Sequence, residues 1–104
     1  MIARVWTARA SKTNAPTYTE HFFNAVLPSV RRLSGYLGAS VLQQDEDETV
    51  EIVVITRWTS LDAIREFAGD AIDRAVVTTE ARELLASFDD RVRHYHVALD
   101  DRSP

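Results

Sequence analysis

The three histidines and two tryptophans are the side chains of this sequence best suited to chemistry. His94 and His96 lie two positions apart in the segment RVRHYHVAL, and on a strand this spacing places both rings on one face. A zinc or iron site would need a third protein ligand. The sequence has no cysteine, and His21 lies on a different predicted element. We therefore predict no metal site.

His21 is the best candidate for a catalytic base. It lies on the flank of an apolar stripe that Tyr18, Phe22 and Ala25 form at helical spacing. The unperturbed pKa of imidazole, about 6.5, suits proton abstraction near neutral pH. The alternative is a half-exposed residue at the edge of the core, with no role in catalysis.

The hydrophobic pattern predicts the elements that must position these side chains. Strands are expected at residues 2–9, 35–44, 49–58 and 91–99. Helices are expected from Pro16 to Gly35 with a kink or restart at Pro28, from Ser60 to Gly69, and over residues 78–88. The resulting β-α-β-β-α-β order is typical of a ferredoxin-like α+β fold with a four-stranded antiparallel sheet. A length of 104 residues indicates one domain over residues 1–104.

The open face of the predicted sheet requires a cover. In strand 49–58 the run Ile52–Ile55 is apolar on both faces, although helices cover only one of them. We therefore expect a homodimer packed sheet to sheet; the alternative is that β-propensity alone selected these residues. Alternation in strand 91–99 favours Tyr95 and Val97 toward the helices. It places His94 and His96 on the open face, and we predict that they and Trp6 lie at the dimer interface.

Composition excludes several classes of function. The net charge is −4 and the basic residues are scattered, so we expect no nucleic-acid partner. No long apolar run is present, and we expect a soluble, cytoplasmic protein that does not engage a membrane. The acidic run at 45–48 lacks the spacing of a calcium loop and is predicted to be a solvated hairpin tip.

A family resemblance becomes visible after the third strand. The segment TRWTSLDAIREFAGDAIDRAV, residues 56–76, resembles the W-x-S-x-x-x-I-x-x-F-A-G…A-V segment of the antibiotic biosynthesis monooxygenase family. The opening ARVW and the closing RVRHYHV are also similar to members of this family. The resemblance implies a dimeric α/β barrel of ferredoxin-like units. Some members oxidise polycyclic phenols with molecular oxygen and without a cofactor, and others degrade haem or act on quinols.

Two departures from the family pattern narrow what the resemblance implies. In polyketide monooxygenases of the family, an asparagine lies four residues before the tryptophan that matches Trp58, and here that position is Val54. Haem degraders add an asparagine on the first strand and a histidine after the tryptophan. The first strand here has no asparagine and residues 61–88 contain no histidine. The missing asparagine weakens an anthrone-type oxidation, and the missing haem-degrader residues argue against haem degradation. Both departures favour a non-catalytic protein of the same fold.

We predict a cofactor-independent monooxygenase-like protein that acts on a small aromatic or quinol-type molecule. The predicted substrate-binding residues are aromatic and lie on or near the two helices: Trp58, Tyr18, Phe22, Tyr36 and Phe67. Flat aromatic walls offer stacking area, and a dry pocket strengthens a base and anion-stabilising donors. The alternative is a non-catalytic dimer of the same fold that binds a small molecule or has a purely structural role.

Overall fold

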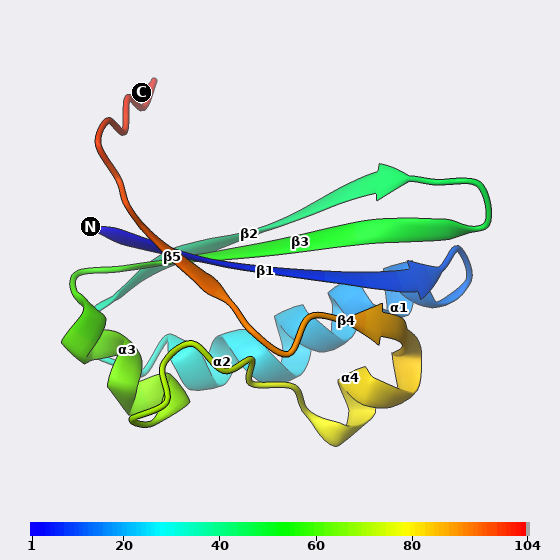
Figure 1. The fold of residues 1–104 in the computed structure, drawn as a ribbon, viewed down its shortest axis with the longest axis horizontal. Helices are drawn as coiled ribbons and strands as arrows, with labels where there is room; N and C mark the ends of the chain where they lie inside the picture. The colour runs from blue at the N-terminus through cyan, green and yellow to red at the C-terminus, as the bar shows by residue number, and fades with distance from the viewer. Residues whose placement is uncertain (104) are drawn as a thin grey trace.

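The computed structural model describes residues 1–103 and has an antiparallel sheet at its centre (Figure 1). Strands β1 (Ile2–Ser11), β2 (Tyr36–Asp45) and β3 (Thr49–Trp58) are long, and β3 lies between the other two. Two short strands, β4 (Leu85–Phe88) and β5 (Arg93–His96), share the other edge of β1. The strand order β2-β3-β1-β4/β5 confirms the predicted ferredoxin-like α+β fold, with the fourth strand divided in two.

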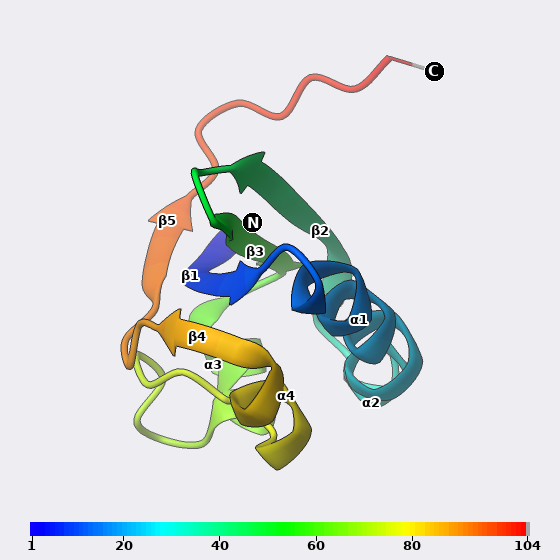
Figure 2. The ribbon, with the colours of Figure 1, turned by 90° about the vertical axis from the view of Figure 1, so that its right-hand side faces the viewer.

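All helices lie on one face of this sheet, and the other face is uncovered (Figures 1 and 2). The first helical segment comprises α1 (Asn14–His21), a π-helical turn η1 (Phe22–Val26) and α2 (Leu27–Val30). Pro28 lacks an N–H and its ring would clash with a carbonyl one turn earlier, so the widened turn before it accommodates the ring. Helix α3 (Leu61–Ala68) follows β3, and α4 (Thr79–Leu84) precedes β4. No helix among residues 1–103 is both long enough and apolar enough to cross a membrane.

The sheet separates its side chains by the parity of their positions. In β3 the even positions Val50–Trp58 are buried under the helices, whereas the odd positions between them are only partly buried. Even positions of β1, among them Ile2 and Ala8, face the same side, because Ile2 pairs with Trp58 and Ala8 with Ile52. The odd positions Val5, Val53 and Ile55 form the uncovered face.

Two C-terminal predictions need correction. Residues 78–88 do not form one helix, because the chain becomes extended at Leu85 and residues 85–88 pair with Ala8, Arg9 and Ala10 of β1. The unpaired edge of β1 competes for these residues and outweighs their helical pattern. The final strand covers only Arg93–His96 instead of residues 91–99.

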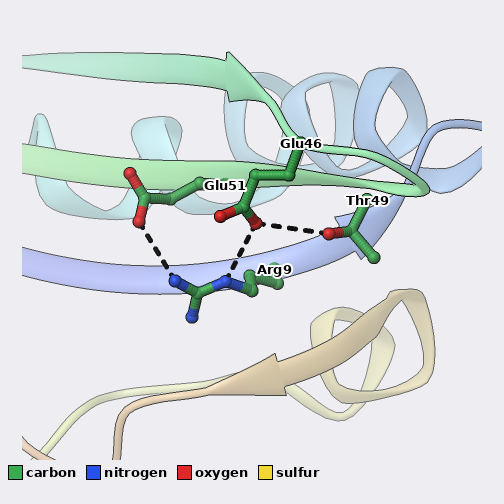
Figure 3. Close-up of polar contacts among 4 residues, drawn as sticks. All are labelled: Arg9, Glu46, Thr49 and Glu51. Atoms are coloured by element: carbon green, nitrogen blue, oxygen red, sulfur yellow. Dashed lines mark hydrogen bonds and ion pairs between the residues drawn. The ribbon is translucent and has the colours of Figure 1, made fainter.

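The acidic hairpin between β2 and β3 is exposed, as predicted, and is tied to β1 through Arg9 (Figure 3). The guanidinium of Arg9 donates to Glu46 at 3.0 Å and to Glu51 at 3.2 Å, and the hydroxyl of Thr49 donates to Glu46 at 3.3 Å. Exposed pairs of this kind contribute little to stability, about 0–1 kcal/mol each. The acidic residues therefore serve a solvated turn.

Gly35 has a different role from the one predicted. Helix α2 ends at Val30, and Gly35 does not have a positive φ. Instead, a Cβ atom at this position would lie 2.3 Å from the Cβ of Ala63 and 2.9 Å from Oγ1 of Thr59. The absence of a side chain lets the start of β2 pack directly against α3. The neighbouring Ser60 caps α3 as predicted, with its Oγ accepting a hydrogen bond from the Ala63 amide at 3.1 Å.

We expect Gly35→Ala to lower the free energy of unfolding by about 1–3 kcal/mol, the usual cost of overpacking. Urea denaturation of the single variants and of the double variant Gly35→Ala/Ala63→Gly measures this effect. Removing the Ala63 methyl group makes room for the new one, so the double variant should lose less stability than the two single losses combined. Wild-type stability for Gly35→Ala, or strict additivity in the double variant, would contradict this close approach.

Candidate functional site

A partly enclosed cavity lies between the helix-facing side of the sheet and the helices. Its walls come from β1, β3, the helical segment 14–30, Phe67 of α3, and residues 76–81. Its volume is about 60 Å³. This is room for a few water molecules and is less than the ~150 Å³ of a cavity that binds benzene. A larger ligand must therefore displace a wall, and residues 76–78 of that wall belong to the segment 69–78, which contains no helix or strand.

Four of the residues predicted for the site line this cavity: His21, Tyr18, Phe22 and Phe67. Trp58 and Tyr36, which were also predicted to bind substrate, do not line it. Trp6, predicted at the dimer interface, lies on the helix-facing side and lines the cavity instead. The structure thus brings the predicted base together with three of the five predicted binding residues.

Trp58 forms the centre of the packing behind the cavity wall. It is fully buried, its ring stacks on Phe67 with centroids 5.7 Å apart, and the ring of Tyr36 meets it edge-on at 5.6 Å. Its indole N–H donates to Oγ1 of Thr56 at 2.8 Å. Phe67 and Thr56 both line the cavity, so Trp58 fixes two wall residues without reaching the space itself.

Arg4 is the charged residue of the cavity wall. It is 4% exposed and projects from β1 toward the helix side. Its Nη1 donates to the carbonyl of Ile72, and its Nη2 donates to the carbonyl of Arg74 at 2.8 Å. The guanidinium also lies over the ring of Phe67, 5.6 Å from its centroid. Burial lowers the pKa of Arg4 to about 10, and Asp73 opposes the shift, so the side chain remains charged at neutral pH.

His94 contacts this arginine and therefore cannot face the open side of the sheet. Its Nε2 lies 3.0 Å from Nη1 of Arg4, and in the sheet His94 pairs with Arg4 and His96 with Ile2. The predicted orientation of the last strand is thus wrong. Tyr95 and Arg93 face the open side, while His94 and His96 share the side of Arg4, His96 being exposed. An interface role for these histidines and for Trp6 loses the placement on which it was based.

The hydrogen bond to Arg4 determines the protonation of His94. A guanidinium has only donors, so Nε2 of His94 must accept and the neutral ring carries its proton on Nδ1. Burial lowers the pKa of His94, the charge of Arg4 lowers it further, and Asp73 opposes both effects. His94 is therefore held neutral as an acceptor for Arg4.

His21, at the end of α1, connects the first helix to the opposite wall of the cavity. Its Nε2 lies 2.9 Å from Oγ1 of Thr78, and the same oxygen accepts from the Ala81 amide at 3.1 Å as the cap of α4. A threonine hydroxyl has one donor and two acceptor positions, so this contact suits either neutral tautomer of His21. When Nε2–H donates to Thr78, Nδ1 keeps a free lone pair.

Tyr18 and Trp6 provide the aromatic part of the cavity. Their ring centroids are 6.3 Å apart, and the indole N–H of Trp6 donates to the carbonyl of Asp89 at 2.7 Å. Burial raises the pKa of the Tyr18 hydroxyl well above its ordinary value. Tyr18 therefore stays protonated at neutral pH and can donate a hydrogen bond.

Sequence reasoning missed Arg4, Thr56 and Thr78 as wall residues. Arg4 stands on a strand between apolar residues and is one of the scattered basic residues of the sequence. The available signal was its parity: Arg4 shares a face with Ile2, Ala8 and Ala10, which are all buried. No group of three or more potential metal-ligating side chains exists among residues 1–103.

The fold and its cavity define the class of the protein: a ferredoxin-like α+β domain with an aromatic-lined cavity between sheet and helices. The sequence matches the antibiotic biosynthesis monooxygenase family over residues 1–77. The chain therefore belongs to this family, as the resemblance in residues 56–76 predicts. No curated protein matches the sequence significantly.

Several solved structures share the fold. A Bacillus cereus protein assigned to the antibiotic biosynthesis monooxygenases is 18% identical, with a TM-score of 0.71 over 100% of this chain and 97% of its own. The haem degrader MhuD from Mycobacterium tuberculosis, solved with two haems in its active site, is 19% identical, with a TM-score of 0.62 over 98% and 100%. The monooxygenase ActVA-Orf6 of Streptomyces coelicolor, in complex with nanaomycin D, is 16% identical, with a TM-score of 0.57 over 99% and 91%. At these identities the similarity establishes the fold.

The contact between Arg4 and His94 predicts a loss of stability in acid. The pKa of His94 is lower in the folded protein than its ordinary value of 6.5. As the pH falls below that value, the unfolded chain binds a proton before the folded one does, and the folded state is destabilised. The stability that neutral His94 contributes is fully present above its ordinary pKa. It is lost as the pH falls toward the lowered pKa of the folded protein.

Thermal denaturation between pH 8 and pH 5 measures this effect. We expect His94→Gln to reduce the slope below pH 6.5, because the amide oxygen of glutamine accepts from Arg4 without titrating. His96→Gln on the same strand is the matched control and should keep the wild-type profile. Equal slopes for the wild type and His94→Gln would show that the contact does not govern acid stability.

Proposed function

We propose that this protein is a cofactor-independent oxygenase that oxidises a small aromatic or quinol-type molecule in the cavity. Family membership supports the reaction class. The observation that carries the proposal is the cavity itself, which is lined by His21 and Thr78 as well as by Tyr18 and Trp6. A potential base and hydrogen-bond donors thus surround an aromatic-lined space.

The reaction needs a substrate that reduces oxygen once it is deprotonated. For an anthrone-type substrate a base removes a proton, and the resulting carbanion or phenolate transfers electrons to O₂ and forms a carbon–oxygen bond. The CH₂ group becomes C=O, and the second oxygen atom leaves as water, which balances one substrate and one O₂ against one ketone and one water. The protein supplies a base, donors for the anion and exclusion of water.

Each wall residue has a role in this proposal. His21 removes the proton through a ring nitrogen, oriented by its contact with Thr78. Tyr18, kept protonated by burial, donates to the anion that forms. Phe22 and Phe67 pack against the flat substrate, and the segment 69–78 moves to admit it because the cavity is small. Trp58 supports Phe67 and Thr56 from behind, and Tyr36 supports Trp58.

A second copy of the chain is the proposed partner. The uncovered face of the sheet carries Val5, Val53 and Ile55, with Leu42 opposite Val53 in the register of β2 and β3. Leu42 is 49% exposed, and Tyr95 on β5 is 47% exposed. An apolar cluster of this kind on the uncovered face of a sheet is costly in water. We propose that two copies cover it, sheet against sheet.

Light scattering coupled to gel filtration tests this assembly. We expect the wild type to have the mass of a dimer at micromolar concentration and Leu42→Lys to shift it to the monomer, because the ammonium group would be buried without a partner. Leu61→Lys is the matched control, since Leu61 is 41% exposed on α3 at the opposite side of the sheet. A monomeric wild type, or dissociation by both substitutions alike, would contradict a sheet-to-sheet dimer.

Oxygen consumption with a panel of anthrones and hydroquinones tests the activity. We expect His21→Gln to lower the rate about 100-fold or more, because general base catalysis contributes ~10²–10⁴-fold. The amide of glutamine preserves the hydrogen bond to Thr78, so the loss would report proton transfer. His96→Gln is the control and should leave the rate unchanged. If the wild type consumes no oxygen above the buffer rate yet binds panel members, the protein is a non-catalytic binding protein instead.

A further inference from the structure

We propose that the cavity selects an aromatic molecule that carries an ionised carboxylate, and that Arg4 binds this group. The inference rests on the proposed function in one respect: it assigns the ligand to the same cavity. It goes further by naming the charge of the ligand and the residue that recognises it.

Arg4 is a buried cation without an anionic hydrogen-bond partner. The ion pairs among residues 1–103 involve Arg9, Arg65, Arg91 and Arg102, and all of them are at the surface. The acceptors of Arg4 are the carbonyls of Ile72 and Arg74 and the neutral ring of His94. Asp73 is the carboxylate that acts on Arg4 electrostatically, but it is bound to Arg91.

A charge removed from water is stable only when it is paired or fully hydrogen-bonded. The acceptors of Nη1 and Nη2, two backbone carbonyls and an imidazole, are all neutral and leave the net charge of the guanidinium uncompensated. The reduced pKa of Arg4 reflects this environment. A carboxylate that enters the cavity would compensate the charge and could form two parallel hydrogen bonds with the guanidinium.

Arg4 lies beside the aromatic wall of the cavity. The guanidinium lies over the ring of Phe67 at 5.6 Å, and Arg4 borders the same cavity as Trp6, Tyr18 and Phe22. A ligand whose flat body contacts these rings therefore places a substituent within reach of the cation. The combination of apolar walls and a single buried charge matches an aromatic acid better than a neutral hydrocarbon or a polar sugar.

A purely structural role for Arg4 makes a different prediction. As a clamp on the carbonyls of Ile72 and Arg74, it would hold the segment 69–78 in place and give the cavity no preference for charge. Binding measurements with a charged and a neutral ligand of the same shape separate the two roles.

Isothermal titration calorimetry with 2-naphthoate and 2-naphthamide at pH 7.5 is the test. We expect the wild type to bind the acid at least about tenfold more tightly than the amide, since a hydrogen bond to a charged group is worth more than a neutral one. Arg4→Gln should abolish this preference and Arg4→Lys should retain part of it. Arg74→Gln is the matched control: it removes one positive charge from an exposed side chain and keeps the carbonyl that Arg4 contacts, so its preference should equal that of the wild type.

Circular dichroism of each variant at the titration temperature verifies the fold, and Arg4→Lys keeps the test valid if Arg4→Gln does not fold. Equal affinity for acid and amide in the wild type, no binding of either, or an unchanged preference in Arg4→Lys and Arg4→Gln would overturn the inference. The outcome is independent of oxygen consumption. A charge preference without oxygen uptake would refute only the oxygenase activity, whereas uptake with neutral substrates and no preference would refute only the role of Arg4.

Discussion

The buried guanidinium of Arg4 is the constraint on which the arrangement around the cavity depends. This side chain of the first strand contacts the segment 69–78, the link after α3, through the carbonyls of Ile72 and Arg74. It contacts the last strand through His94. These partners are about 70 to 90 residues away in sequence. Because a buried charge is stable only when its donors are satisfied, the positions of β5 and of the link are fixed relative to β1. The cavity is the space that remains between them and the helices.

The alternation of side chains along β1 and β3 determines which residues share the face of Arg4. Arg4 shares its face with Trp6 on β1, and the antiparallel register places Thr56 opposite Arg4 and Val54 opposite Trp6. All four line the cavity. A shift of one residue in this register would exchange the two faces. A slip of β3 would bring Val53 and Ile55 under the helices, and a slip of β1 would move the charge of Arg4 to the open side. The packing of Trp58 against Ile2, Val30 and Ile64 at the other end of the strand holds the register in place.

Elements with local sequence signals are predicted correctly. Prediction fails for elements whose conformation or orientation depends on pairing with another strand. Strand 49–58, the capped helix after Ser60 and the restart near Pro28 follow from alternation, caps and a missing N–H, and the structure has them all. The family likewise follows from residues 56–76. The face of the last strand does not, because RVRHYHV carries apolar residues at both parities. Only its register against β1, with Arg4 opposite His94, determines which side faces the helices. Residues 85–88 fail for a similar reason, since the free edge of β1 converts a helical pattern into a strand.

The small volume of the cavity and the charge in its wall are two consequences of the same contacts. The link closes the cavity because Arg4 holds its carbonyls and because Thr78 contacts His21. Backbone hydrogen bonds to the segment before β5 support it, from Ala75 to Asp90 and from Val92 to Asp73, each at 2.8 Å. A ligand group that replaces the carbonyls on the guanidinium would release the link at the point where space is needed. In the proposed binding of a carboxylate by Arg4, recognition and opening would be coupled through one side chain, because the free energy of the new charge-assisted hydrogen bonds would offset the contacts that the link gives up.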